Sequence, residues 1–214
     1  ATMGSGIDKR NLKSTVYQVL LGLTAMQSVR QQSESGGYDL VPSNRELAGA
    51  EIEMVDLENR ETRLKSALDS IAAEYDFILL DCPPALNLLT LNGLVAAEAV
   101  MIPMQCEYFA LEGLSDLVET IRKVRKHLNP RLEIEGLVRT MYDPRNSLAQ
   151  QVSAQLQQHF GDKLYATIIP RNVRLAEAPS YGAPAVNLDK ACKGSQAYMA
   201  LAAELLSRSA IALV

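Results

Sequence analysis

The fold is decided by the stretch Tyr75-Asp76-Phe77-Ile78-Leu79-Leu80-Asp81-Cys82-Pro83-Pro84 of this 214-residue chain. Four apolar residues follow one another from Phe77 to Leu80 without a polar residue between them. Such a run predicts a strand buried on both faces, which is typical of a parallel sheet enclosed between helices. Asp81 ends the run, and the two prolines that follow prevent the strand from continuing.

Strand and helix patterns alternate on both sides of this stretch. Further strands are predicted at 38–42, 99–103, 133–141 and 166–169. Helices are predicted at 12–21, 45–55, 61–74, 88–97, 111–128, 149–160 and 195–207, and a polar loop at 27–37. This order calls for an α/β fold with a mostly parallel, doubly wound sheet flanked by helices. Because the sequence contains no repeat or low-complexity linker, residues 1–214 are predicted to form a single domain.

Composition excludes several classes of protein. Hydrophobic residues make up 48% of the chain, which is too many for a disordered segment, and no run of about 18 apolar residues predicts a membrane span. The three cysteines are far apart and predict reduced thiols in a cytoplasmic protein. The net charge of −4 argues against a wholesale nucleic-acid coat, but residues 108–214 contain more bases than acids. A basic patch in this second half therefore remains open.

Asp81 lies where a ligand is expected, because open parallel sheets bind ligands beyond the carboxyl ends of their strands. A carboxylate at such a strand end can hold the water shell of Mg²⁺ bound to nucleotide phosphates, as a Walker B element does. Many other α/β proteins also end a strand with Asp. The turn at Cys82-Pro83-Pro84 is either an ordinary strand exit or a rigid switch that responds to a phosphate.

Four more segments share a family pattern with 75–84. They are Leu47-Ala48-Gly49-Ala50-Glu51, Pro103-Met104-Gln105-Cys106-Glu107-Tyr108-Phe109-Ala110-Leu111-Glu112-Gly113, Thr140-Met141-Tyr142-Asp143 and Ile169-Pro170-Arg171-Asn172-Val173-Arg174-Leu175-Ala176-Glu177-Ala178-Pro179-Ser180. Together these segments resemble the ParA/Soj family of DNA-partitioning ATPases, nearly from end to end and in the family's order. The resemblance implies a P-loop NTPase-like fold in a cytoplasmic, nucleoid-associated protein.

The resemblance also implies a cycle. ATP, with Mg²⁺ as cofactor, would drive formation of a homodimer that binds duplex DNA without sequence choice, and a ParB-like partner would stimulate hydrolysis and release. A MinD-like division-site regulator is an alternative from the same superfamily. Such a protein would be expected to end in a basic amphipathic membrane helix, whereas residues 205–214 contain a single positive charge. No membrane partner is therefore expected.

The sequence departs from the family in one respect. It contains no Gly-x-x-x-x-Gly-Lys-Ser/Thr loop, and Gly4-Ser5-Gly6 has neither the lysine nor the following helix that would replace it. Compared with the family, the first strand, the P-loop helix and the second strand are missing. Because that loop's N–H groups and lysines hold the phosphates, the chain as written is expected neither to hydrolyse ATP nor to fold stably alone, and it contributes no catalytic residue. A non-enzymatic, truncated paralogue that binds DNA or a partner is the rival interpretation.

The resemblance places adenine contacts at Pro170 and Asn172. An Asn amide carries both a donor and an acceptor and can pair with the edge of adenine. The alternative is that Asn172 is a loop residue that caps a turn.

The resemblance also implies DNA-binding roles for Arg145 and Arg174, and Arg171 is a third candidate. Contacts from arginine to phosphate give affinity without sequence choice and a strong salt dependence. The alternative is that these are solvated surface arginines, and Arg171 is equally open to a structural role. Lys123 and Lys126 could extend the patch, although cations at a helix end also suit the helix dipole.

Overall fold

The structure is a computed structural model in which residues 1–108 and 110–209 are described. The chain divides into two compact units. The first consists of Ala1–Ala99, Glu119–Glu133 and Ser180–Ala183, and the second of Val100–Val118, Ile134–Pro179 and Pro184–Val214. Each unit is described by itself below, and the single domain predicted from the sequence stays a prediction.

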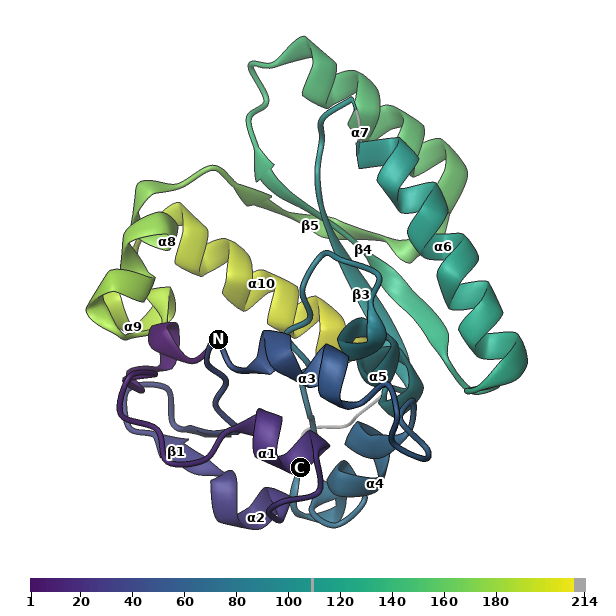
Figure 1. Ribbon diagram of the computed structural model, residues 1–214. Helices are drawn as coiled ribbons and strands as arrows, with labels where there is room; N and C mark the ends of the chain where they lie inside the picture. Colours follow the sequence, from purple (N-terminus) through teal and green to yellow (C-terminus); the bar gives the residue numbers. More distant parts are fainter. Residues whose placement is uncertain (109, 210–214) are drawn as a thin grey trace. The chain divides into compact units, whose positions relative to one another are not determined.

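The second unit is built on a three-stranded sheet (Figure 1). Its strands are β3 (Ala99–Gln105), β4 (Glu133–Tyr142) and β5 (Leu164–Pro170), in the order β3-β4-β5. β4 and β5 run parallel, with Leu137 opposite Leu164 and Tyr142 opposite Pro170. These are three of the predicted strands, so the α/β prediction with a parallel sheet is confirmed for this unit.

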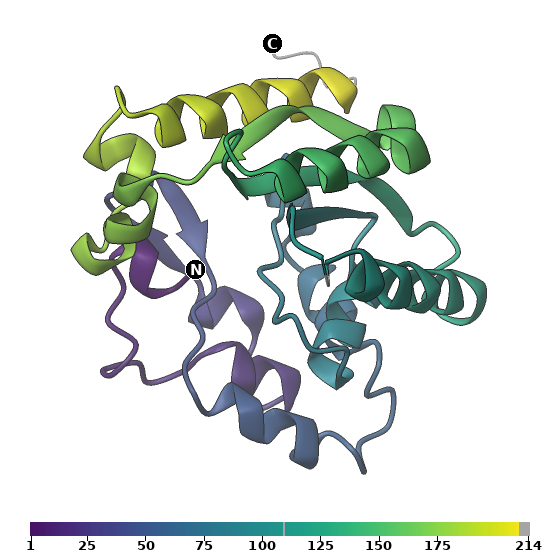
Figure 2. The same cartoon turned by 90° about the horizontal axis from the view of Figure 1, so that it is seen from above.

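Helices cover both faces of this sheet. α7 (Ser147–Phe160) lies on one face and α10 (Lys193–Arg208) on the other, as Figure 2 shows. Val138, Tyr165 and Ile169 of the sheet pack against Leu201 of α10. α7 begins two residues before the predicted start, because the side chain of Asn146 accepts hydrogen bonds from the N–H groups of Leu148 and Ala149. Both helices were predicted from their apolar periodicity.

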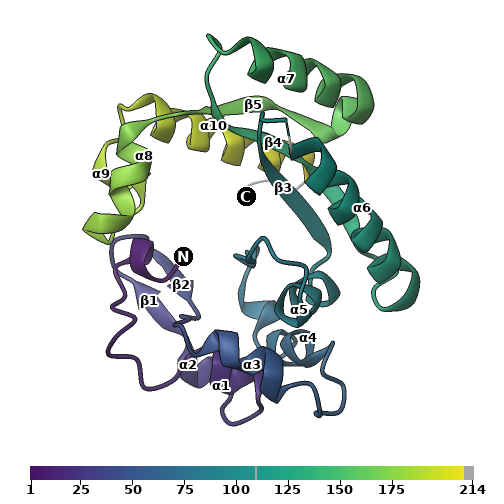
Figure 3. The ribbon, with the colours of Figure 1, turned by 45° about the horizontal axis from the view of Figure 1, so that its top comes forward.

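The first unit is mainly helical. Its elements are α1 (Val16–Leu20), α2 (Met26–Val29), α3 (Leu47–Glu53), α4 (Arg63–Leu68), α5 (Leu88–Ala96) and the antiparallel pair of β1 (Gln31–Ser33) and β2 (Tyr38–Leu40) (Figure 3). One apolar cluster joins α1 and α2 to Ile71, and a second joins α1 to α3. α6 (Ala110–His127) has residues in both units, and the short α8 (Val173–Glu177) and α9 (Ala185–Leu188) belong to the second.

The strand predicted at 77–81 is wrong. No described strand pairs with these residues, and Leu79 is 84% exposed. Phe77 and Ile78 are exposed as well. An apolar run forms a buried strand only where neighbouring strands satisfy its N–H and C=O groups and helices cover its faces. The sheet of the second unit does not include this run, so it remains an irregular extended segment.

Three smaller expectations also need correction. The predicted loop at 27–37 contains the end of α2 and all of β1, because the polar Gln31–Ser33 pairs through its backbone with β2. α1 begins four residues later than predicted, since Thr15 and Gln18 form a capping box that sets its start. The helix predicted at 61–74 is limited to α4 and a short 3₁₀ turn at Ala72–Glu74.

Within the described residues, no helix is both long and apolar enough to cross a bilayer. α10 ends at Arg208. The sequence argument against a membrane-binding tail includes residues 210–214, which lie outside the described residues.

A polar clamp holds the end of α10 on the start of β5. Arg208 stacks on Tyr165, with its guanidinium carbon 4.0 Å from the ring centre, and donates to Glu204 Oε1 at 2.8 Å. Glu204 accepts hydrogen bonds from the backbone N–H groups of Ala166 and Thr167, each at 2.8 Å. Burial alone would raise the pKa of Glu204, but the hydrogen bonds from Thr167, Ala166 and Arg208 hold that pKa at about 2.

We therefore expect Glu204→Gln to lower the free energy of unfolding by on the order of 2 kcal/mol at pH 7. The folded-state pKa lies below the ordinary value of about 4.3, so this contribution is present above about pH 4.3 and is lost as pH falls toward 2. Urea unfolding of the wild type and the variant at several pH values measures it. Glu112→Gln, at an exposed glutamate, should change stability by less than about 0.5 kcal/mol. A difference between wild type and Glu204→Gln that stays constant from pH 6 to pH 2 would contradict the clamp.

Candidate functional site

Asp81 lies in the first unit, in the extended segment that follows Phe77–Leu80. Its side chain is 70% exposed, and Oδ2 accepts a hydrogen bond from the amino group of Ala1 at 2.6 Å. Among the described residues, no three His, Cys, Asp or Glu side chains gather as a metal site. A single open carboxylate fits Mg²⁺ held through water, because Mg²⁺ keeps several waters and takes one or two protein carboxylates beside phosphate oxygens.

The turn after Asp81 is anchored to the start of α5. Asn87 caps this helix by accepting from the N–H of Thr90, and the Thr90 hydroxyl donates to the carbonyl of Ala85 at 2.5 Å. A Cβ at Gly93 would lie 2.8 Å from the Cys82 sulfur, so only glycine allows this approach. Burial and the charge of Asp81 raise the pKa of the Cys82 thiol. Cys82 is therefore unsuited to act as a nucleophile near neutral pH.

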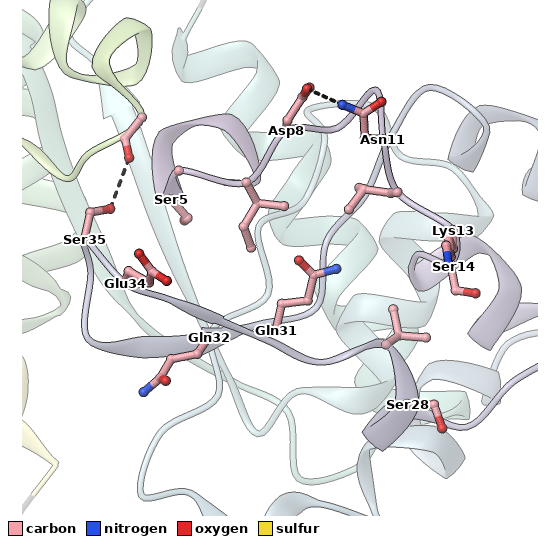
Figure 4. Close-up of a pocket in the computed structure, with 15 residues that line it drawn as sticks. Ser5, Asp8, Asn11, Lys13, Ser14, Ser28, Gln31, Gln32, Glu34 and Ser35 are labelled. Atoms are coloured by element: carbon pink, nitrogen blue, oxygen red, sulfur yellow. Dashed lines mark hydrogen bonds between the residues drawn. The ribbon is translucent and has the colours of Figure 1, made fainter.

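Gly4-Ser5-Gly6 does not form a phosphate loop. Met3–Ser5 is one 3₁₀ turn, and the chain after Gly6 continues as a loop to Thr15. This loop and β1 border a polar cavity of about 1140 Å³ in the first unit (Figure 4). Asp8 in this wall already accepts from the side chain of Asn11 at 3.0 Å. The cavity wall contains two acids, Asp8 and Glu34, and one lysine, Lys13.

A smaller cavity of about 250 Å³ lies at the carboxyl ends of the strands in the second unit. Gln105 ends β3, Tyr142 ends β4 and Arg171 follows β5, and all three line it. The remaining lining residues are Cys106, Glu107, Met141, Asp143, Asn146 and Ala149. In open α/β sheets this edge is where ligands bind. Cys106 and Asn146 were not singled out from the sequence, although their positions just after a strand and just before a helix were available signals.

The end of β4 is irregular where it borders this cavity. Met141 has a φ of 49°, in the left-handed region that side chains other than glycine rarely adopt, and the register with β5 shifts between Arg139 and Tyr142. The Tyr142 carbonyl accepts from the backbone N–H of Arg171 at 3.2 Å, which joins the exits of β4 and β5. Such bulges redirect side chains next to binding sites. The irregularity therefore places Tyr142 and Arg171 side by side on the cavity wall.

Pro170 and Asn172 flank Arg171 at the exit of β5. Asn172 caps α8, because its Oδ1 accepts from the N–H groups of Arg174 at 2.9 Å and Leu175 at 3.4 Å. Its side-chain NH₂ makes no hydrogen bond to any residue that the structure describes. Asn172 therefore acts as the cap of α8. An adenine contact remains a prediction, and only the side-chain NH₂ of Asn172 is available to make it.

Two of the three candidate DNA-binding arginines are paired with acids. Arg145 is 89% exposed and makes a two-pronged ion pair with Asp143, with contacts of 2.7 and 3.0 Å that hold the pKa of Asp143 at about 2. Arg174 lies 3.1 Å from Glu177 and 3.6 Å from Asp189. Arg171 is exposed, and its guanidinium has no ion pair with any described residue. The sequence did not reveal these pairs, although two of the acids are only two or three residues away, because spacing alone does not determine side-chain geometry.

The rates at which the three cysteines are alkylated test the environments of their thiols. Hydrogen bonds with Ser195 at the start of α10 lower the pKa of Cys192. Burial raises the pKa of Cys106, and partial desolvation together with the charge of Asp81 raises the pKa of Cys82, although Cys82 is exposed. We expect iodoacetamide to alkylate Cys192 first at pH 7, because the thiolate is the reactive species. Peptide mass spectrometry over time measures the order. Ser195→Ala should slow the labelling of Cys192, and faster labelling of Cys82 than of Cys192 would contradict the assignment.

Sequence comparisons with known proteins agree with the family resemblance described above. A sequence-family model described as an AAA domain matches residues 1–134. The chain is 50% identical over 207 residues to the chromosome partitioning protein ParA of Caulobacter vibrioides, covering 96% of this chain and 78% of that protein. It is 47% identical over 205 residues to the sporulation initiation inhibitor protein Soj of Bacillus subtilis, covering 96% and 81%.

Solved structures agree on the fold. Cobyrinic acid a,c-diamide synthase from Mycobacterium smegmatis, with a bound ATP analogue and magnesium, aligns with a TM-score of 0.85 at 33% identity and covers 98% of this chain and 78% of that one. The cell division ATPase MinD of Pyrococcus furiosus aligns with a TM-score of 0.76 at 20% identity, covering 96% and 80%. The second likeness concerns the fold alone.

Proposed function

Because the chain belongs to the ParA/Soj family of chromosome-partitioning ATPases, we propose that it contributes the base-binding and Mg²⁺-side residues of such an ATPase. The observation that supports the base-binding part is the exit of β5, where Pro170 and Asn172 flank Arg171, a residue that lines the cavity at the carboxyl ends of the strands. The structural relative with a bound ATP analogue and magnesium supports the choice of ligand.

The proposed binding mode assigns one task to each group. Pro170 packs against the adenine ring at the exit of β5, and the Asn172 NH₂ donates to a ring nitrogen. Asp81 holds the water shell of Mg²⁺, and the ion, when bound, neutralises phosphate charge. Hydrolysis further requires a Gly-rich loop with lysines, which this sequence does not contain. We assign no catalytic residue to the chain.

The wider function follows the family. The protein acts in the cytoplasm on the nucleoid, where an ATP-dependent homodimer binds duplex DNA without sequence choice and a ParB-like protein stimulates hydrolysis. A second candidate is a non-enzymatic paralogue that keeps the DNA or partner contacts. Measured ATP turnover by the protein, abolished by Asp81→Asn, would exclude this second candidate.

Asn172→Asp tests the adenine contact without removing the helix cap. Aspartate caps a helix as well as asparagine does, but it has no NH₂ to donate. We expect saturation transfer from the protein to the adenine H2 and H8 protons of ATP, and a roughly tenfold weaker affinity in the variant, as for one lost hydrogen bond of about 1.4 kcal/mol.

Asn44→Asp is the matched control, because Asn44 makes the same kind of side-chain contact, to the N–H of Glu46, far along the sequence. Its affinity for ATP should equal that of the wild type. If the wild type binds ATP and Asn172→Asp binds it equally well, the adenine contact is wrong while the family assignment stands.

Asp81→Asn tests the Mg²⁺ side. We expect Mg²⁺ to increase the affinity of the wild type for ATP and to have no such effect on the variant, because a neutral amide holds the hydrated ion less well. Isothermal titration with and without Mg²⁺ measures both affinities. Asp76→Asn, at another exposed aspartate of the same segment, is the control and should keep the Mg²⁺ effect. An equal Mg²⁺ effect in Asp81→Asn would remove Asp81 from the site.

A further inference from the structure

The last turns of α6 and the loop after it form a strongly cationic surface in the first unit. Residues 119–133 contain five lysines and arginines but only two acids, Glu119 and Glu133. All five cations are exposed: Arg122, Lys123, Arg125, Lys126 and Arg131. We call these five residues the α6 cationic face, and α6 is the long teal helix of Figure 1.

The helix presents Arg122, Lys123 and Lys126 on one side because its other side is buried. Ile121 and Val124 are each 3% exposed and face the core. Lys126 lies three residues after Lys123 and four after Arg122, so these three share the outer side of the helix. Arg125 lies one turn, about 5.4 Å, beyond Ile121 and is exposed near the end of the helix. The end of this helix is also held in place. The side-chain NH₂ of Asn129 lies 2.7 to 3.2 Å from three carbonyls of the α5 region.

Little negative charge offsets this surface. Glu119 lies 3.8 Å from Arg122 and 3.9 Å from Lys123, which are long contacts between exposed side chains. Exposed pairs of this kind contribute little. Arg125, Lys126 and Arg131 have no ion pair with any described residue. Glu98 and Glu133 approach only through their backbone, where the Glu133 N–H donates to the Glu98 carbonyl at 3.0 Å.

The contrast with Arg145 decides where phosphate would bind more readily. Arg145 must give up a two-pronged contact with Asp143 at 2.7 Å before it can pair with a phosphate. The exposed pair of Arg174 with Glu177 at 3.1 Å is a weak competitor, as Glu119 is. The cations of the α6 cationic face have no such competitor apart from Glu119. Counterion release on binding is therefore available at this face without first breaking a strong ion pair.

We propose that the α6 cationic face is a contact surface for the phosphate backbone of duplex DNA, in addition to Arg145 and Arg174. The proposal rests on the DNA binding included in the proposed function. A protein partner is less suitable, because protein interfaces depend on buried aromatic or apolar anchors. Leu128 is the one exposed large hydrophobic residue among 119–133. Spaced cations without such anchors suit a phosphate backbone read without sequence choice.

The stabilising role of cations at a helix end must be separated from this binding role. Arg125, Lys126 and His127 lie in the last turn of α6, where positive charge favours the helix dipole by about 0.3–1 kcal/mol each. Glutamine is therefore the appropriate replacement, because it forms helices nearly as well as lysine and arginine do. Thermal melting then reports the loss of helix stability independently of DNA binding.

The experiment compares the protein with Arg122→Gln/Arg125→Gln/Lys126→Gln. Fluorescence anisotropy on a labelled duplex of arbitrary sequence gives the affinity at four salt concentrations. Each lost phosphate contact should lower the slope of log K against log salt by about 0.9, so we expect a slope lower by two to three and an affinity lower by tenfold or more. A matched control removes the same charge from exposed cations elsewhere in the first unit, Lys9→Gln/Arg10→Gln/Arg45→Gln. Its slope should remain close to that of the wild type.

Each possible result of this experiment either supports or overturns the proposed DNA contact at the α6 cationic face. A lower slope in the α6 variant alone, with folding retained, supports the proposal. An unchanged slope in the α6 variant, or an equal loss in both variants, overturns it while DNA binding by the protein stands. Loss of the slope only in Arg145→Gln/Arg174→Gln confines DNA binding to those two arginines. If the wild type binds no duplex, the DNA part of the proposed function fails together with this surface. If it binds polyglutamate instead, the face is a site for acidic protein and the proposal is wrong.

Discussion

The parallel pairing of β4 with β5 is the constraint on which the second unit depends. Parallel strands bring their carboxyl ends to the same edge, so Tyr142 and the residues after Pro170 become neighbours although they are far apart in sequence. The pairing survives because helices bury both faces of the sheet, with α10 fixed to β5 by Arg208 and Glu204. Without this cover, the apolar strands would expose Val138 and Ile169, and the ligand-binding edge would have no fixed geometry.

Sequence periodicity predicted the elements whose stability comes from their own residues. α6 and α7 each bury one side, α5 buries four consecutive residues from Asn92 to Val95, and β3 was recognisable as an apolar run. The run at Phe77–Leu80 has the same appearance, but a strand needs a partner to bond with, and sequence alone does not supply the partner. β1 shows the converse, because a polar segment became a strand once β2 was beside it. In both segments, whether a strand formed depended on a neighbouring strand to pair with and not on amino-acid composition.

In the candidate site, too, the sequence predicted the residue types but not the contacts that these residues make. The sequence and the family resemblance identified Asp81, Pro170 and Asn172 as residues of the right chemistry, but only Pro170 and Asn172 lie at a strand end in the structure. It could not show that Asn172 uses its carbonyl to cap α8, or that Arg145 and Arg174 are held by carboxylates. These are local contacts between neighbouring residues, and they depend on side-chain geometry that spacing does not determine. The positive φ of Met141 is likewise a property of the bulge and not of methionine.

Whether a cation of this protein can bind phosphate therefore depends more on its ion-pair partners than on the net charge of the chain. A net charge of −4 disfavours DNA binding by the molecule as a whole, yet phosphate responds to local potential within about a Debye length of 8–10 Å. On that scale an arginine in a two-pronged ion pair with an aspartate is close to neutral, whereas Arg125 and Lys126 retain their full charge. A helix that buries Ile121 and Val124 must turn its remaining side chains to solvent, and here those side chains are cations. The same amphipathic pattern that folds α6 thus concentrates positive charge on its outer side.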